Sequence, residues 1–265
     1  MNDTGKREDT LEPRLIRPDD LDPRIDWNRP IQAPGHMGVD FETRVDFRRL
    51  HRYRLARARE ALKNSECGAL LLFDVNNIRY VSSPKIGEWE RAKCCRFALL
   101  AADSEPIVWD FGSAAYHHKL YCDWLETDNC RAGMLGMRGT VPPSAGLMKS
   151  HAEEIMDILR QMGVADLPVG VDLAETAMFF ELQNAGMKMV DGQQIMLNAR
   201  EIKNVDEITL LNQAAAMVDG VYHMVYEELK PGVRENDIVA WANKMLYEHG
   251  SVSYTHLTLP TNREV

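Results

Sequence analysis

One polar loop of this 265-residue chain carries side chains that suit substrate recognition. The segment Ser82–Arg96 contains one tryptophan and two arginines between apolar stretches of sequence. An indole ring forms an apolar wall, and a guanidinium binds a carboxylate through two parallel hydrogen bonds. Trp89, Arg91 and Arg96 are therefore candidate substrate-pocket residues. The alternative is a loop in which Trp89 packs on the domain and solvent surrounds the arginines.

Two adjacent histidines, His117 and His118, lie close in sequence to Asp110 and Cys122. All four are metal-ligating residue types. Side chains of adjacent helical residues, however, point about 100° apart and rarely share one ion. We therefore expect a surface or partly packed histidine pair. Gly133, Gly136 and Gly139 follow no predicted strand, so we expect a flexible loop there instead of a phosphate-binding one.

The composition of the chain excludes several classes of protein. Lys and Arg number 31 and Asp and Glu 40, a formal net charge of −9, whereas contacts to nucleic-acid phosphates need a basic face. No apolar run approaches the ~18 residues of a membrane-spanning helix. The five cysteines form no CxxC pair, which favours reduced thiols. We therefore expect a cytoplasmic protein that binds neither nucleic acid nor membrane.

The elements that position these residues alternate between strands and helices. Continuous short apolar runs predict buried strands, and apolar residues at 3.6-residue spacing predict helices. The predicted strands are Ala69–Phe73, Phe97–Ala101, Ile107–Trp109, Pro168–Asp172 and Met187–Val190. The first predicted helix begins at Thr43, and the others are Ala114–Leu120, Ala145–Met162 and Ala174–Asn184. This alternation predicts a three-layer α/β domain. In the first helix, the face carrying Arg48, Arg49, Arg52 and Arg59 is interpreted as a solvated face.

Two longer helices follow this domain. Asn204 and Glu207 have the spacing of a capping box, and Pro231-Gly232 ends the helix that they begin. A second helix is predicted at Glu235–His249. Both helices have wide apolar faces, and the remaining Ser251–Val265 is too short to cover them. We therefore expect the second domain to be incomplete.

Several motifs resemble those of a known family. They are FDVNNIRY at 73–80, DGQQ at 191–194, AREIK at 199–203, DEI at 206–208 and KPG at 230–232. In this order and spacing, they resemble the creatinase, prolidase and Xaa-Pro aminopeptidase branch of the pita-bread metallopeptidases. The resemblance implies an α/β creatinase-type three-layer N-terminal domain at 43–197. It also implies the first two helices of a truncated α+β pita-bread domain at 198–250.

The flanking segments and one cap depart from this pattern. Residues 1–42 hold five of the twelve prolines and are predicted to form an irregular arm. Arg234 stands where the family has a Thr cap, which weakens the start of the second helix by ~1 kcal/mol. The segment Val252–Thr261 resembles the translation of a transposase-type sequencing adapter. We therefore expect residues 251–265 to be non-native and the natural gene to continue past Gly250.

The resemblance implies that this chain is part of a longer enzyme, which we call the parent. The parent would hold two divalent metal ions, Mn, Co or Zn, through two Asp, one His and two Glu. In the family, these ligands lie downstream of the second helix. After Gly250 this chain has no Asp, one His (His256) and one Glu (Glu264). We therefore expect this chain to bind neither metal ion and to be inactive as it stands.

The parent then resembles a homodimeric metallopeptidase, an Xaa-Pro aminopeptidase or prolidase that hydrolyses peptides. In creatinase-like dimers, the loop that corresponds to the one carrying Trp89, Arg91 and Arg96 leans over the partner's active site. One alternative is a dimethylsulfoniopropionate lyase or creatinase-like enzyme acting on a small zwitterion. Another is a non-catalytic pseudo-enzyme or binding module, since fold alone does not fix chemistry.

Overall fold

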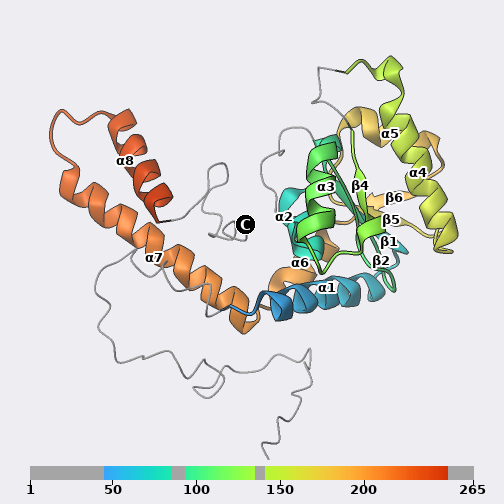
Figure 1. The fold of residues 1–265 in the computed structure, drawn as a ribbon, viewed down its shortest axis with the longest axis horizontal. Helices are drawn as coiled ribbons and strands as arrows, with labels where there is room; N and C mark the ends of the chain where they lie inside the picture. The colour runs from blue at the N-terminus through green and yellow to red at the C-terminus, as the bar shows by residue number, and fades with distance from the viewer. Residues whose placement is uncertain (1–44, 85–92, 135–140, 250–265) are drawn as a thin grey trace, which may run out of the picture.

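A computed structural model describes residues 45–84, 93–134 and 141–249 (Figure 1). The predicted arm at 1–42 and the predicted non-native tail at 251–265 lie outside these residues. Eight α-helices are described: α1 Phe47–Lys63, α2 Val75–Ser82, α3 Gly112–Tyr121, α4 Leu147–Gln161, α5 Thr176–Asn184, α6 Gln193–Glu201, α7 Val205–Glu228 and α8 Glu235–Glu248. The described strands are β1 Ala69–Leu72, β2 Phe97–Ala101, β3 Ile107–Asp110, β4 Cys130–Ala132, β5 Val169–Val171 and β6 Met189–Asp191.

The strands form one mixed sheet in the order β4-β3-β2-β1-β5-β6. β2 runs antiparallel to both of its neighbours, and the other pairs are parallel. In register, Ala69 of β1 lies opposite Ala101 of β2 and Val169 of β5. Since β1, β5 and β6 are parallel, they end at the same edge of the sheet, where α2 and α6 begin.

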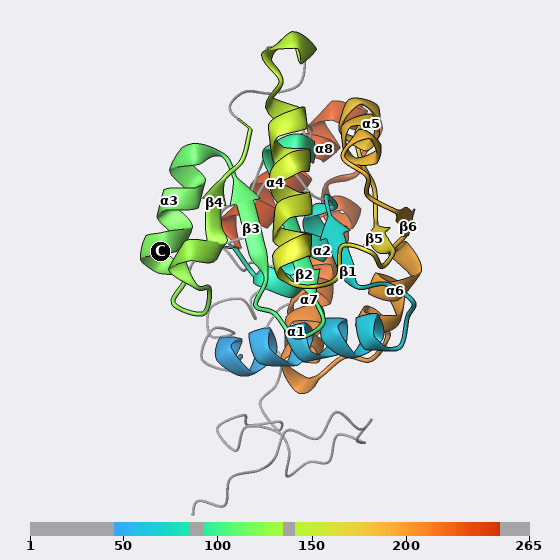
Figure 2. The same cartoon turned by 90° about the vertical axis from the view of Figure 1, so that its right-hand side faces the viewer.

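Helices cover both faces of the sheet (Figure 2). Successive side chains of β1 point to opposite faces of the sheet, as in any β-strand. Ala69 and Leu71 join a core that includes residues of α4 and α5. Leu70 and Leu72 join a second core with residues of α1, α2 and α6. The predicted α/β architecture is therefore confirmed for this part, which we call the sheet domain (the described residues from 45 to 203).

The helical pair, α7 and α8, extends away from the sheet domain, and α8 folds back against α7 (Figure 1). α7 buries Leu210 and Met217, whereas Tyr222 is 70% and Tyr226 is 78% exposed. α8 has no buried residue. Much of the wide apolar faces predicted for these two helices is thus uncovered among the described residues. Within these ranges, no helix has both the length and the apolar character needed to cross a membrane.

Three elements of the sheet domain were absent from the sequence-based prediction. They are α2, α6 and β4, which have eight, nine and three residues. Two turns of helix give too few apolar repeats to define a period, and three residues give no alternation. The predicted capping box is confirmed at the start of α7. After α5, Gly186 adopts a left-handed φ of 93°, as glycines that follow a helix commonly do.

Candidate functional site

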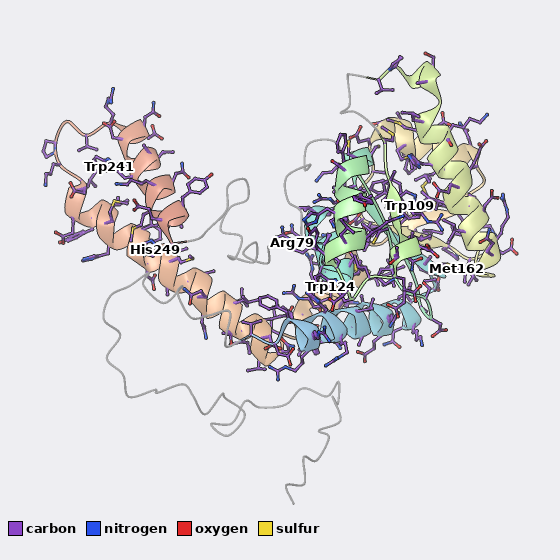
Figure 3. The ribbon with its side chains drawn as sticks, viewed as in Figure 1. Arg79, Trp109, Trp124, Met162, Trp241 and His249 are labelled. Carbon is purple, nitrogen blue, oxygen red and sulfur yellow. The ribbon has the colours of Figure 1, made fainter. Side chains whose placement is uncertain are left out.

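The motifs at 73–80, 191–194, 199–203 and 206–208, far apart in sequence, converge on one pocket between α2, α6 and the start of α7. Its volume is about 720 Å³. Figure 3 shows Arg79 of α2 on the side of the sheet domain that faces the helical pair. Each of these four motifs contributes lining residues, which include Asn76, Arg79, Tyr80, Gln194, Arg200, Lys203 and Glu207. The pocket is therefore the candidate functional site of the described residues.

A half-buried carboxylate, Asp172 directly after β5, fixes the start of α2. It accepts hydrogen bonds from the backbone N–H groups of Phe73 and Asp74, at 2.8 and 3.0 Å. The Asn77 side chain donates a further bond of 2.9 Å to the same carboxylate. Burial raises the pKa of Asp172, and these hydrogen bonds oppose the rise. The motif at 73–80 therefore joins the ends of two strands and aims α2 into the pocket.

A close backbone approach and one hydroxyl position α6 beside α2. A Cβ atom on Gly192 would lie 2.6 Å from the carbonyl carbon of Gly170, so only glycine allows β5 and the start of α6 to approach this closely. At the other end of α6, the Tyr80 hydroxyl donates a 2.9 Å hydrogen bond to the carbonyl of Ala199. Burial, the largest cause, raises the pKa of Tyr80, and this keeps its hydroxyl protonated as a donor.

Ion pairs from α1 fix the start of α7, which closes the pocket. Arg54 Nε lies 2.8 Å from Glu207 Oε1, and its guanidinium lies over the Tyr80 ring, 5.5 Å from the centroid. Arg49 Nη2 lies 2.7 Å from Oδ1 of Asp206, which is 1% exposed. The interpretation of the arginine face of α1 as solvated is therefore wrong for Arg49. It is also wrong for Arg59, which pairs with Glu105 at 2.8 Å.

Further cations that line the pocket come from the α6–α7 junction and from α2. Arg200 is half-buried and, within the described ranges, forms no hydrogen bond or ion pair. Lys203 donates a hydrogen bond of 3.0 Å to the backbone carbonyl of Glu201, so its charge is not matched by a carboxylate there. Arg79 supplies a third positive charge from α2. The pocket can therefore attract an anion.

Arg96, proposed from the sequence as a substrate-binding residue, is buried in a network of this chain's own side chains. Its Nε lies 2.7 Å from Asp110 Oδ2, and its side chain is 4% exposed. The same carboxylate oxygen lies 2.8 Å from His118 Nε2, and His118 Nδ1 lies 3.9 Å from Cys122 Sγ. In this structure Arg96 therefore already binds a carboxylate. Trp89 and Arg91 lie outside the described residues and stay predictions.

The histidine pair is divided between two environments. His118 is fully buried in the network with Asp110, whereas the His117 ring packs on Tyr121 with the ring centroids 4.5 Å apart. Within residues 45–84, 93–134 and 141–249, no three His, Cys, Asp or Glu residues form a group that could hold a metal ion. The described residues therefore do not fit the dinuclear site that the family resemblance implies.

The segment before Gly133 differs from the sequence-based expectation. A short strand, β4, ends at Ala132 and pairs with β3. The Gly133 N–H donates a 2.6 Å hydrogen bond to the Asp110 carbonyl, and a Cβ on Gly133 would lie 2.7 Å from the Cys95 carbonyl oxygen. Gly133 is therefore needed for close backbone packing. Gly136 and Gly139 lie outside the described residues.

Sequence reasoning used the motifs only as family markers and missed their shared pocket. The residues were available, since AREIK contains Arg200 and Lys203. No sequence pattern indicated that α6 packs against α2. That packing depends on contacts between residues more than 100 positions apart in the chain, such as Tyr80 and Ala199.

Comparison with known proteins gives sequence relatives and similar folds. No family model matches the chain. The dimethylsulfoniopropionate lyase DddP of Roseovarius nubinhibens is 24% identical over 210 residues, which are 74% of this chain and 45% of that protein. The protein of the same name from Roseobacter denitrificans is 25% identical over 172 residues, 64% of this chain and 38% of that protein. The chain thus spans less than half the length of the curated relatives that it matches.

Solved structures of peptidases share the fold. The Xaa-Pro dipeptidase of Bacillus anthracis superposes with a TM-score of 0.57 at 15% identity, over 77% of this chain and 50% of that one. Dipeptidase PepE of Mycobacterium ulcerans gives 0.54 at 20% identity, over 76% and 50% of the two chains. At such identities the comparison shows the fold alone. The resemblance that the motifs indicated is thereby confirmed: this chain has the fold of part of the prolidase-type, pita-bread metallopeptidases, over about half of their length.

Proposed function

We propose that this chain is the N-terminal scaffold of a metal-dependent hydrolase of the Xaa-Pro aminopeptidase or prolidase type. The observation that supports this proposal most is the fold shared with two dipeptidases across about three quarters of the chain. The sheet domain is complete in its core, since both faces of the sheet are covered. The fold and the motif order together favour a protein of this class over an unrelated α/β domain.

The catalytic metal site of the proposed parent lies outside the described residues. Two divalent ions, Mn, Co or Zn, would activate water and polarise a peptide carbonyl there. No described cluster of side chains fits such ions, so this chain's proposed role is to support the catalytic region. Arg49 and Arg54 carry out that role by joining α1 to the start of α7. A cytoplasmic homodimer, in which Trp89 and Arg91 reach the partner's substrate, belongs to the same proposal.

A second candidate function is the cleavage of a small zwitterion. It is favoured by one specific observation: both curated relatives described above are named dimethylsulfoniopropionate lyase. A lyase needs a base beside the acidic carbon of its substrate, whereas a peptidase directs water to a carbonyl. The two candidates therefore differ in the catalytic region and share the scaffold described here.

The complete reading frame distinguishes these candidates. The gene would be sequenced from an adapter-free library, and its full product would be purified and supplied with manganese. A hydrolase releases free proline from an Xaa-Pro dipeptide and leaves dimethylsulfoniopropionate intact. A lyase cleaves dimethylsulfoniopropionate and leaves the dipeptide intact. The matched control is the present 265-residue chain, for which we expect neither activity. Xaa-Pro hydrolysis by that control would contradict the proposed division between scaffold and catalytic region.

A further inference from the structure

Arg200 differs from three other half-buried arginines of the sheet domain. Arg54, Arg57 and Arg59 each form an ion pair with a carboxylate of the chain, with N···O distances of 2.8 Å. Arg200 is half-buried as well, but among the described residues it has no such partner. A guanidinium in a concave, partly desolvated position attracts an anion, because its charge is only partly solvated there.

The charges that line the pocket favour an anion, although the chain as a whole is acidic. The lining includes four cationic and two acidic residues: Arg54, Arg79, Arg200, Lys203, Glu201 and Glu207. Glu207 is occupied, because it pairs with Arg54 and accepts a 3.2 Å hydrogen bond from the Asn204 backbone in the capping box. The local excess of positive charge is therefore centred on Arg200 and Lys203, at the junction of α6 and α7.

The uncharged part of the pocket indicates the rest of the ligand. Leu197 is 45% and Leu211 is 49% exposed, and Ala214 lies one turn further along α7. Apolar side chains in a hollow bind an apolar group better than they bind water. A volume of about 720 Å³ falls in the range of pockets for small molecules. A bare inorganic anion would leave this apolar wall uncovered.

We propose that the pocket between α2, α6 and α7 binds a carboxylate attached to a short apolar group. Arg200 binds the carboxylate through two parallel hydrogen bonds, and the apolar group contacts Leu197 and Leu211. A free small organic acid and the C-terminal end of a peptide both have this chemistry. The site is separate from the metal chemistry proposed above and does not depend on it.

Calorimetric titration of the 265-residue chain tests the proposal. The probes are isovalerate for a free acid, N-acetyl-leucine for a peptide end, and inorganic phosphate for an anion without an apolar group. We expect at least one carboxylate probe to bind, and Arg200→Gln to weaken it tenfold or more, because a bidentate contact to a charge is lost. The tighter of the two carboxylate probes identifies the source. Arg52→Gln is the matched control, since Arg52 is an exposed arginine of α1 that does not line the pocket.

Arg200→Lys keeps the charge and removes the planar fork, so we expect an affinity between those of the unsubstituted chain and Arg200→Gln. If Arg200→Gln loses its helical circular dichroism signal and is therefore unfolded, the affinity of Arg200→Lys for the carboxylate probes tests the proposal instead. The proposal is overturned if neither carboxylate binds the folded chain, or if phosphate binds as tightly as both. Equal weakening by Arg52→Gln and Arg200→Gln overturns it too, because the effect would then follow net charge alone.

Discussion

The sheet domain and the helical pair have similar apolar composition but bury it differently. Leu71 and Leu159 of the sheet domain are fully buried, whereas Leu229, directly after α7, is 57% exposed and α8 buries no residue. Both regions contain well-formed helices, so helix formation does not distinguish them. The difference is that a sheet gives its helices an apolar surface to cover, and the helical pair has only itself. Helical periodicity therefore predicts a helix and not the surface that buries it.

The junction between the two regions combines ion pairs with a small apolar cluster. α1 meets the start of α7 through Arg49 with Asp206 and Arg54 with Glu207. Beside these pairs there is a small apolar cluster of Val45, Leu50 and Leu210. Buried ion pairs are costly to break and contribute little net stability when intact. We infer that they set the direction of α7 more than they stabilise it.

The largest expected effect is on the free energy of unfolding, and it is tested with one leucine from each region. Leu71→Ala removes a fully buried side chain of β1, so we expect the free energy of unfolding to fall by about 2–5 kcal/mol. Leu229→Ala truncates an exposed side chain, and the fall should be less than about 0.5 kcal/mol. Urea unfolding followed by circular dichroism measures both. Equal losses would show that α7 is buried in solution, and the comparison would fail.

The next effect concerns the junction. Arg49→Ala leaves the Asp206 carboxylate buried, with a 3.0 Å hydrogen bond from the Asp46 backbone and without its cation. The carboxylate also keeps a 3.4 Å hydrogen bond from the Asn204 side chain, so what it loses is hydrogen bonding to a cation, and such a bond contributes about 1.5–3 kcal/mol. We therefore expect faster hydrogen exchange in the first turns of α7. Arg48→Ala is the control, because its pair with Asp123 is exposed and contributes less than about 1 kcal/mol. Unchanged exchange in Arg49→Ala would contradict an electrostatic junction.

A smaller effect separates the two helix starts of the helical pair. The Asn204 side chain accepts a 2.9 Å hydrogen bond from the Glu207 N–H, so Asn204→Ala should weaken the start of α7 by about 1 kcal/mol. At α8, the Arg234 side chain has no acceptor atom and pairs with Asp237 instead. Arg234→Thr supplies an acceptor, and we expect slower amide exchange in the first turn of α8. Faster exchange would show that the Arg234–Asp237 pair is the better cap.

Much of the sheet domain was predictable from its sequence, and the candidate site was not. β2 lies at the predicted residues 97–101, because a continuous apolar run between polar residues has few other interpretations. Capping at Asn204 was predictable for the same reason, since its pattern is local. The pocket depends instead on α2 and α6, two short helices held by Asp172 and Tyr80 over long sequence separations. Arg96 shows the same limit: its partner, Asp110, was considered only as a metal ligand.

The smallest expected effect is a pH dependence that should appear only in the sheet domain. Burial raises the pKa of Glu154, but hydrogen bonds from Arg131, His151 and Trp109 outweigh it and lower the pKa below its ordinary 4.5. The folded state therefore binds this proton less readily than the unfolded state. The resulting stability is present above pH 4.5 and is lost as the pH falls through the lowered pKa.

Glu154→Gln removes that contribution, so its stability deficit relative to the unsubstituted chain should shrink as the pH falls below 4.5 and through the lowered pKa of Glu154. The counterpart in the helical pair is Asp237, whose pKa is lowered by hydrogen bonds from Arg234, a side chain that is 80% exposed. Solvent screens such a pair, so Asp237→Asn should leave the pH dependence of urea unfolding unchanged. A deficit for Glu154→Gln that stays constant with pH would show that Glu154 acts through packing and not through its charge. The distinction between a region with a half-buried polar network around Glu154 and a region without one would then lose its electrostatic basis.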